Sequence, residues 1–90
     1  MLQPELEDLF IREEAWDKIN SGEWTSTPGY IEDSKTFFGC LNEYVRHYDP
    51  SGHHRATTHR IYDPATDVER HRHGKDIIIN GVKYRSISKW

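Results

Sequence analysis

Histidine is the first residue type in this chain that could do chemistry, because all six histidines lie after residue 46. His71 and His73 are two residues apart, so on a strand their side chains would point the same way and could bind a metal ion together. A zinc site needs further ligands, and the sequence offers neither a cysteine pair nor an acid at a third-ligand position. We therefore expect no metal site and no cofactor.

Acid–base chemistry without a metal is the next candidate. An antiparallel sheet that presents a Glu base, a His acid and Arg groups for phosphate has what RNA cleavage requires. The sequence supplies one such set: Arg60, Glu69, His71 and His73. Any polar sheet face in this segment would hold the same residues, and a cross-strand Arg–Glu pair is worth only roughly 0.2–1 kcal/mol. Catalysis is therefore an alternative hypothesis and not the leading one.

The clearest structural signal adjoins these residues and is the pair Asn80-Gly81 between two β-branched runs. Asn-Gly favours the two-residue turn of a β-hairpin, because both central residues of that turn need a positive φ. A two-residue loop fixes the register and gives the hairpin one apolar face and one charged face. The expected cross-strand pairs are Ile79–Val82, Ile78–Lys83, Ile77–Tyr84 and Asp76–Arg85.

A second hairpin is expected upstream, with strands at 54–62 and 67–73 on either side of the turn sequence DPAT. With Asp63–Thr66 as the loop, the expected pairs are Tyr62–Asp67, Ile61–Val68, Arg60–Glu69, Thr58–His71 and Ala56–His73. This register would bring the candidate catalytic residues to one face. A slip of one residue would move His71 and His73 to the other face. His73-Gly74 is expected to join the two hairpins.

The first half of the chain indicates helices. Apolar residues at helical spacing predict one helix over about 4–20 and another over about 34–47, with a loop at 23–31 between them. The expected fold is α+β: two N-terminal helices packed on one face of a C-terminal four-stranded antiparallel meander, in the order ααββββ.

The length and charge of the chain limit the classes of function that it can have. Ninety residues predict a single domain over 1–90, with an acidic helical half (1–48) and a basic, His-rich sheet half (53–90). The formal charge is −7 for residues 1–45 and +4 for residues 46–90, which predicts two different surfaces. A lone cysteine, Cys40, and an N-terminus without signal-peptide features predict a cytoplasmic protein without a membrane partner.

Recognition is the leading hypothesis, since a small acidic chain without a catalytic motif has little room for a pocket. We expect a small cofactor-free binding module, a regulator or inhibitor of the phage or mobile-element anti-defence type. It would occupy a surface of a larger protein or nucleoprotein complex. The candidate partner-binding residues are Glu7, Glu13, Glu14, Asp17, Trp24, Tyr30, Arg70, Arg72 and Trp90. The alternative is direct action on nucleic acid through the basic half, including metal-independent RNA cleavage.

Overall fold

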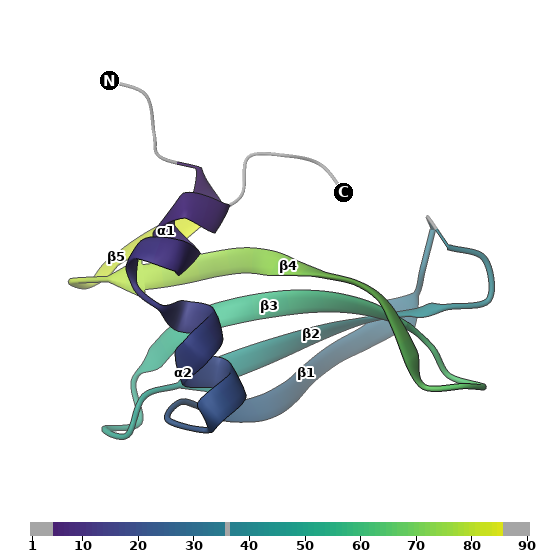
Figure 1. Ribbon diagram of the computed structural model, residues 1–90, viewed down its shortest axis with the longest axis horizontal. Coiled ribbons are helices and arrows are strands. Elements are labelled where there is room, and N and C mark those ends of the chain that lie inside the picture. Colours follow the sequence, from purple (N-terminus) through teal and green to yellow (C-terminus); the bar gives the residue numbers. More distant parts are fainter. Residues whose placement is uncertain (1–4, 36, 86–90) are drawn as a thin grey trace.

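The computed structural model describes residues 5–35 and 37–85. Two short helices, α1 (Leu6–Arg12) and α2 (Ala15–Ser21), precede five strands. The strands are β1 (Thr25–Asp33), β2 (Leu41–Tyr48), β3 (His54–Asp63), β4 (Val68–Ile79) and β5 (Val82–Arg85). They form one antiparallel sheet in the order β1-β2-β3-β4-β5 (Figure 1). The α+β class is confirmed, but the predicted count of four strands is wrong. No helix in the described ranges is long and apolar enough to span a membrane.

The single helix predicted over 4–20 is wrong, because the chain breaks between α1 and α2 and residues 1–4 lie outside the described part. Glu14 takes a left-handed conformation with φ 54° and ψ 35°. The break changes the direction of the chain, so that Phe10 and Trp16 meet with ring centroids 5.2 Å apart and Ala15 is fully buried. Apolar spacing continues through both helices, which is why it does not reveal the break.

The helix predicted over 34–47 is also wrong, and its second half is β2. Ser34 starts a turn instead of a helix, since its Oγ accepts the Phe37 N–H at 3.0 Å, and Gly39 ends the turn with φ 84°. The following sequence, LNEYVRHY, holds aromatic and β-branched residues that suit a strand paired on both sides.

The predicted loop at 23–31 is mostly β1, the edge strand beside β2. Trp24 immediately precedes β1 and is only 2% exposed. Its ring packs in the core, with Lys18 Nζ 5.4 Å and the Arg55 guanidinium 5.2 Å from the ring centroid. Trp24 therefore closes the core and presents no surface to a partner, contrary to its place among the candidate partner-binding residues.

The β4–β5 hairpin has the predicted register, with Asn80 at φ 52° and Gly81 at φ 78° in the turn. The β3–β4 register is wrong by two residues near the turn. The observed pairs include Asp63–Val68, Tyr62–Glu69, Ile61–His71, Arg60–Arg72, His59–His73 and Thr58–Gly74. Asp67 takes φ 57° and donates its N–H to the Asp63 carbonyl at 2.7 Å, which moves the turn one residue along the chain. Two irregularities in the pairing then shift the register further.

Gly74 was predicted as a turn but lies inside the continuous strand β4. A Cβ on Gly74 would stand 2.6 Å from the ring of Phe10, so glycine is what allows α1 to approach the strand. The Gly74 N–H donates to Glu7 Oε1 at 3.1 Å, which ties α1 to β4. The core joins both helices to the sheet and comprises Leu6, Leu9, Phe10, Ala15, Trp24, Ala56 and Ile77.

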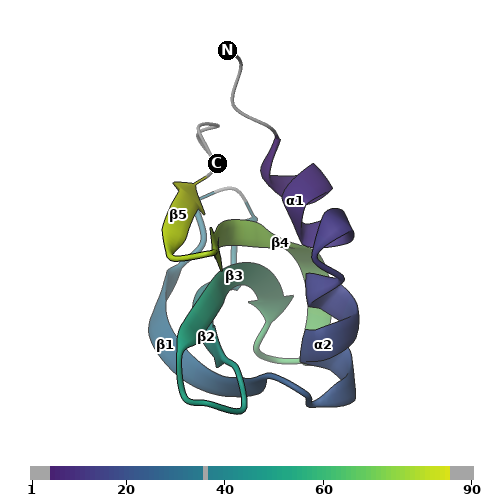
Figure 2. The same cartoon turned by 90° about the vertical axis from the view of Figure 1, so that its left-hand side faces the viewer.

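Both helices lie on the same side of a strongly curved sheet (Figure 2). We call this side the helix face and the opposite side the groove face. Side chains alternate along each strand, so cross-strand neighbours share a face. Ala56 and Ile77, which pack on the helices, define the helix face. His59 is three residues from Ala56 on β3, so its side chain points to the opposite side, the groove face. His73 pairs directly with His59 across β3 and β4 and belongs to the same face.

Candidate functional site

The groove face contains a groove of about 650 Å³ to which all five strands contribute. Aromatic side chains line it on β1 and β2, Arg46 lies among them on β2, and lysines line it on β4 and β5. The lining residues include Tyr30, Glu32, Tyr44, Arg46, Tyr48, His54, Lys75, Asp76 and Lys83. A concave surface with convergent aromatic and polar groups is the usual location of a binding site.

A β-bulge in β1 positions the first of these aromatic residues. Between Pro28 and Ile31 the register shifts, so Gly29 and Tyr30 together lie opposite Tyr44 of β2. A Cβ on Gly29 would stand 2.7 Å from the Tyr44 carbonyl oxygen, so the bulge closes only because that residue is glycine. Bulges commonly redirect a side chain next to a site. Here the bulge brings Tyr30, which is 61% exposed, to the stack on Tyr44 with ring centroids 6.1 Å apart.

The ring stack continues across the sheet from Tyr44 to the histidines. Tyr44 and His59 lie almost parallel, with centroids 4.8 Å apart and an interplanar angle of 13°. His59 Nδ1 and His73 Nε2 are 2.7 Å apart and share one hydrogen bond. Burial raises the pKa of Tyr44, with the Glu32 carboxylate contributing to the same direction. Tyr30, Tyr44, His59 and His73 thus form a row of rings, which we call the aromatic floor. The Tyr44 hydroxyl stays protonated within it.

The two histidines of this floor are buried, at 3% exposure for His59 and 5% for His73. Burial lowers the pKa of His73 to about 4, and the neighbouring His59 adds to that shift. Burial also lowers the pKa of His59, with a further contribution from Lys75. Both rings are therefore neutral near pH 7, so one nitrogen of the pair donates and the other accepts.

Basic side chains flank the aromatic floor. Arg46 is exposed between Tyr44 and Tyr48 on the same face of β2. Lys75 Nζ lies 5.3 Å from the centroid of the Tyr44 ring. Lys83 Nζ lies 3.7 Å from Asp76 Oδ2, and Asp76 is only 8% exposed. Of the two carboxylates that line the groove, Asp76 is thus covered and paired with a lysine.

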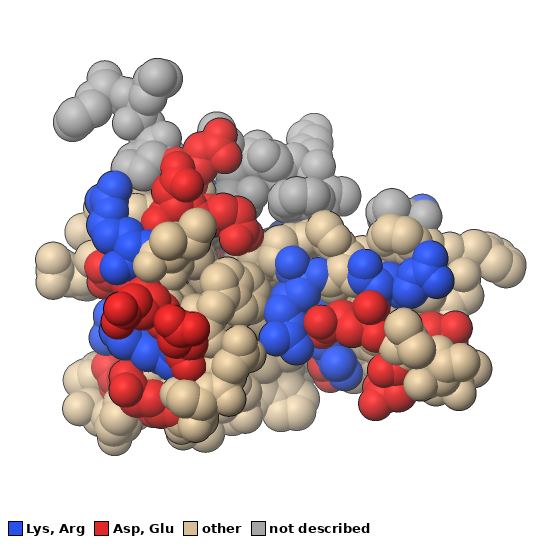
Figure 3. All heavy atoms as spheres, viewed as in Figure 1, with Lys and Arg blue, Asp and Glu red and all other residues tan. Residues whose placement is uncertain are grey.

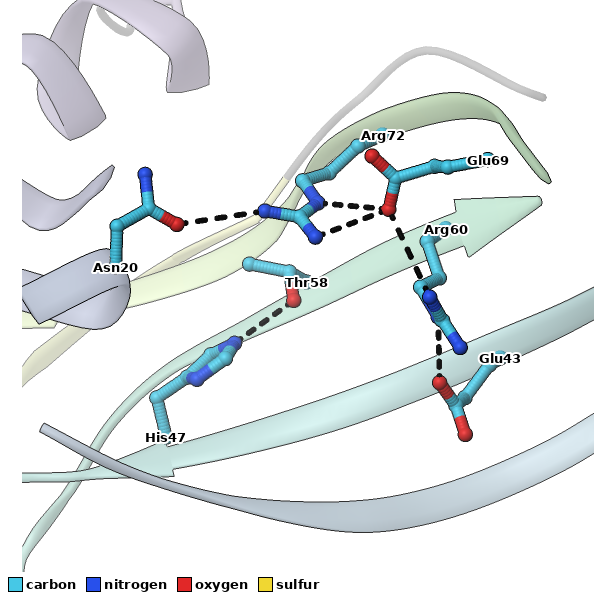
Figure 4. A network of polar contacts seen from close by, with 7 residues as sticks. All are labelled: Asn20, Glu43, His47, Thr58, Arg60, Glu69 and Arg72. Carbon is cyan, nitrogen blue, oxygen red and sulfur yellow. Dashed lines mark hydrogen bonds and ion pairs between the residues drawn. The ribbon is translucent and has the colours of Figure 1, made fainter. Parts of the chain in front are cut away.

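The helix face contains a different polar network, drawn in Figure 4. Arg60 donates to Glu43 at 2.7 Å and lies 3.9 Å from Glu69, which also accepts from Arg72 at 3.0 Å. Arg72 reaches α2 through Asn20, at 3.5 Å. Each charge in this network already has a partner of opposite sign.

His47 lies beside this network and is only 2% exposed. Ser26 Oγ is 2.8 Å from its Nδ1 and Thr58 Oγ1 is 2.7 Å from its Nε2. Burial lowers the pKa of His47 to about 4, and the charge of Arg72 adds to the shift. A smaller cavity of about 360 Å³ lies here beneath α2. With both ring nitrogens engaged, His47 is poorly placed to exchange protons with a ligand.

The predicted catalytic set is divided between the two faces. Arg60 and Glu69 lie together on the helix face, whereas His71 and His73 lie together on the groove face with ring centroids 4.6 Å apart. The cause is the register of β3 and β4, which pairs His71 with Ile61 instead of Thr58. The geometry therefore does not bring the four residues into one catalytic cluster.

The predicted partner-binding residues are also dispersed. The acidic members lie on or between the helices, where Figure 3 shows acidic side chains gathered over α1 and α2; they are Glu7, Glu13, Glu14 and Asp17. Tyr30 belongs to the groove, and Trp24 belongs to the core. Arg70 and Arg72 are exposed on β4, and Trp90 lies outside the described residues.

Sequence reasoning missed Tyr44 and Tyr48 as site residues because it assigned them to a helical stripe, and it counted Arg46 only among the basic residues of the second half. The available signal was their spacing at alternate positions, which puts all three on one face of a strand. Within residues 5–35 and 37–85, no group of three or more His, Cys, Asp and Glu side chains is placed to hold a metal ion. No protein-family model matches the chain, and no curated protein or solved structure matches it.

Proposed function

We propose that this chain is a cofactor-free binding module that takes a short single-stranded nucleic acid in the groove. The observation that supports this most is the alternation of Tyr44, Arg46 and Tyr48 along the groove face of β2. Proteins that bind single strands combine aromatic rings, on which bases stack, with basic side chains that follow the phosphates. Tyr30 and Lys75 extend the same combination on both sides of Tyr44.

The spacing along β2 suits an oligonucleotide. Tyr44 and Tyr48 are four residues apart, which corresponds to roughly 13 Å along a strand at 3.3 Å per residue. Each has a second ring beside it, since Tyr30 stacks on Tyr44 and His54 lies 5.5 Å from Tyr48. A base can stack at the exposed Tyr30 end of the Tyr44 stack and another at Tyr48, and the guanidinium of Arg46 lies between these positions, where an intervening phosphate would lie.

The net charge of −3 does not oppose this proposal, because the charges are separated in space. The exposed acids of the helices lie on the opposite side of the sheet from the groove. In the groove, Lys83 offsets Asp76, which leaves Arg46 and Lys75 against Glu32. A polyanion would therefore meet a locally basic surface.

Fluorescence anisotropy with labelled eight-nucleotide single strands of RNA and DNA tests the proposal. Binding should weaken as salt rises from 50 to 200 mM, because phosphate contacts release counterions. Tyr30→Leu should weaken binding about tenfold, since loss of one stacked base costs about 1–3 kcal/mol. Tyr62→Leu is the matched control, because Tyr62 lies on the helix face beneath Arg60. No binding of either RNA or DNA by the wild-type chain would refute the proposal.

We also propose, as a second candidate, a regulator or inhibitor that docks its helices on a basic surface of a larger protein or nucleoprotein complex. The favouring observation is Ile11, which is 69% exposed on α1 among exposed acids. An apolar anchor within a charged rim is typical of a docking surface.

Pull-down from lysate with Asp8→Lys and Asp17→Lys tests this docking. Both changes should abolish capture of a specific protein, whereas Glu23→Lys, an exposed acid beyond α2, should not. Equal capture by all variants would exclude the helices as the docking surface.

A further inference from the structure

We infer that the groove selects guanine among the bases of a single strand, and that the Glu32 carboxylate is the specificity determinant. This inference rests on the proposed function, because it concerns the base that stacks beside Tyr30 and Tyr44. The observation is the location of Glu32 at the end of the ring stack: its Oε1 lies 3.5 Å from the Tyr44 hydroxyl, and it lines the groove.

Glu32 has acceptor capacity to offer a ligand. The contact from the Tyr44 hydroxyl is long for an O–H···O hydrogen bond, and no other side-chain hydrogen bond or ion pair to Glu32 exists in the described part of the chain. The second carboxylate of the groove, Asp76, differs because it is only 8% exposed and lies 3.7 Å from Lys83. Glu32 is only partly buried. A base in the groove would therefore meet the Glu32 carboxylate.

A carboxylate accepts hydrogen bonds and donates none, so it selects a base edge that carries donors. Guanine alone presents two adjacent donors, N1–H and the N2 amino group, which match the two oxygens of one carboxylate. Adenine, cytosine and uracil each place an acceptor beside their donor, and that acceptor would face a carboxylate oxygen. Unpaired bases are read on this Watson–Crick edge in single strands, while their faces stack on aromatic rings. Tyr30 supplies such a face, since it is 61% exposed.

The test uses fluorescein-labelled RNA octamers that are uridine at every position except the fourth, which is G, A, C or U. The wild-type chain should bind the G-containing octamer about tenfold more tightly than the others, because a good bidentate contact discriminates by about 1–3 kcal/mol. Glu32→Gln should remove this preference and bind the A and C octamers more tightly than wild type. A glutamine presents one donor and one acceptor and carries no charge that opposes the phosphates.

Asp33→Asn is the matched control. It removes the same charge from the next residue of β1, where Asp33 is exposed and pairs with Leu41. This variant should retain the preference for guanine. Circular dichroism melting of both variants should match wild type, so that a change in preference reflects recognition.

Equal affinity of the wild-type chain for all four octamers would overturn the guanine inference and leave the proposed function standing. Absence of binding to every octamer, and to the DNA equivalents, would overturn the proposed function and the inference with it. A guanine preference retained in Glu32→Gln would show that another group reads the base, and would also overturn the assignment to Glu32.

Discussion

The two faces of the sheet use similar residues in opposite ways. On the helix face, Arg60 and Arg72 are directly paired across β3 and β4, and Glu43 and Glu69 neutralise them. On the groove face, Arg46 is exposed and forms no ion pair within the described ranges, and Lys75 lies over the ring of Tyr44. The helix face thus satisfies its own charges, while the groove face leaves basic and aromatic groups open. Similar residue types yield an ion-pair network on one side and, on the other, the exposed groove that we propose as a binding surface.

The largest effect is expected from lowering the pH, which acts on one buried histidine on each face, His47 on the helix face and His73 on the groove face. Their folded pKa of about 4 lies below the ordinary value of 6.5, so the unfolded chain binds more protons between these pH values. The contribution of these two histidines to the unfolding free energy is therefore fully present above pH 6.5 and is lost as the pH decreases toward 4. The expected loss is on the order of 2 kcal/mol for each histidine, and therefore about 4 kcal/mol for the two together.

Urea unfolding at pH 7, 6, 5 and 4.5 measures this loss. His47→Gln and His73→Gln should each flatten the dependence of the unfolding free energy on pH, and the two reductions should add because the residues lie on opposite faces. An unchanged slope in both variants would show that neither histidine is buried neutral.

The next comparison concerns two glycines at close contacts, one on each face: Gly74, which lets the ring of Phe10 pack against β4, and Gly29, which lies against the backbone of Tyr44. Gly74→Ala would place a Cβ 2.6 Å from Phe10, which is fully buried, and should reduce the unfolding free energy by about 3 kcal/mol. Phe10→Leu in the same chain should recover part of that loss, because it shortens the side chain that collides. Urea titration of the single and double variants measures the coupling.

Gly29→Ala is the counterpart on the groove face. Its Cβ would meet the Tyr44 carbonyl at 2.7 Å and force the bulge of β1 open. β1 is an edge strand, so we expect a smaller loss of stability, about 1–2 kcal/mol, with a larger loss of oligonucleotide binding. If Gly29→Ala unfolded the chain more than Gly74→Ala, the bulge would have a structural role instead.

The features that the sequence predicted are those determined by neighbouring residues. The Asn80-Gly81 turn fixed the β4–β5 register, because its two positive φ values depend on the turn residues alone. The β3–β4 register depends on the left-handed conformation of Asp67 and on two irregularities in the pairing, which no local pattern announced. That error misplaced His71 and His73.

The groove was not predicted either, because it also depends on strand pairing and not on local sequence. The apolar residues over 37–48 fit both a helical stripe and a strand, and pairing with β1 and β3 decides between them. Tyr44, Arg46 and Tyr48 share a face only in the strand. The position of Glu32 beside Tyr44 further depends on the bulge at Gly29, which only the assembled sheet reveals.

A smaller effect is expected from the basic groups of the groove. Arg46→Ala combined with Lys75→Ala should weaken oligonucleotide binding several-fold and reduce the slope of log affinity against log salt by about 1.4, at about 0.7 for each phosphate contact on a single strand. Arg12→Ala removes an exposed cation from α1 on the opposite side and should leave the slope unchanged. Anisotropy titrations at three salt concentrations give both slopes. A similar reduction in Arg12→Ala would indicate a general charge effect and not a groove.

The smallest effect is expected on the helix face, from Glu69→Gln. Glu69 lies between Arg60 and Arg72, with contacts at 3.9 and 3.0 Å, and its loss leaves two like charges paired across the strands. Arg60 keeps Glu43 at 2.7 Å, and the side chain of Glu69 is 34% exposed, so we expect a loss of only about 0.5–1 kcal/mol. The loss should shrink at high salt.

Glu23→Gln removes an acid that forms no ion pair in the described residues and should cost less than Glu69→Gln does. Oligonucleotide affinity should be the same in both variants, because the helix face does not contact the groove. A change in affinity specific to Glu69→Gln would contradict the independence of the two faces. It would mean that the ion pairs of Arg60 and Arg72 help to set the curvature of the sheet on which the groove depends.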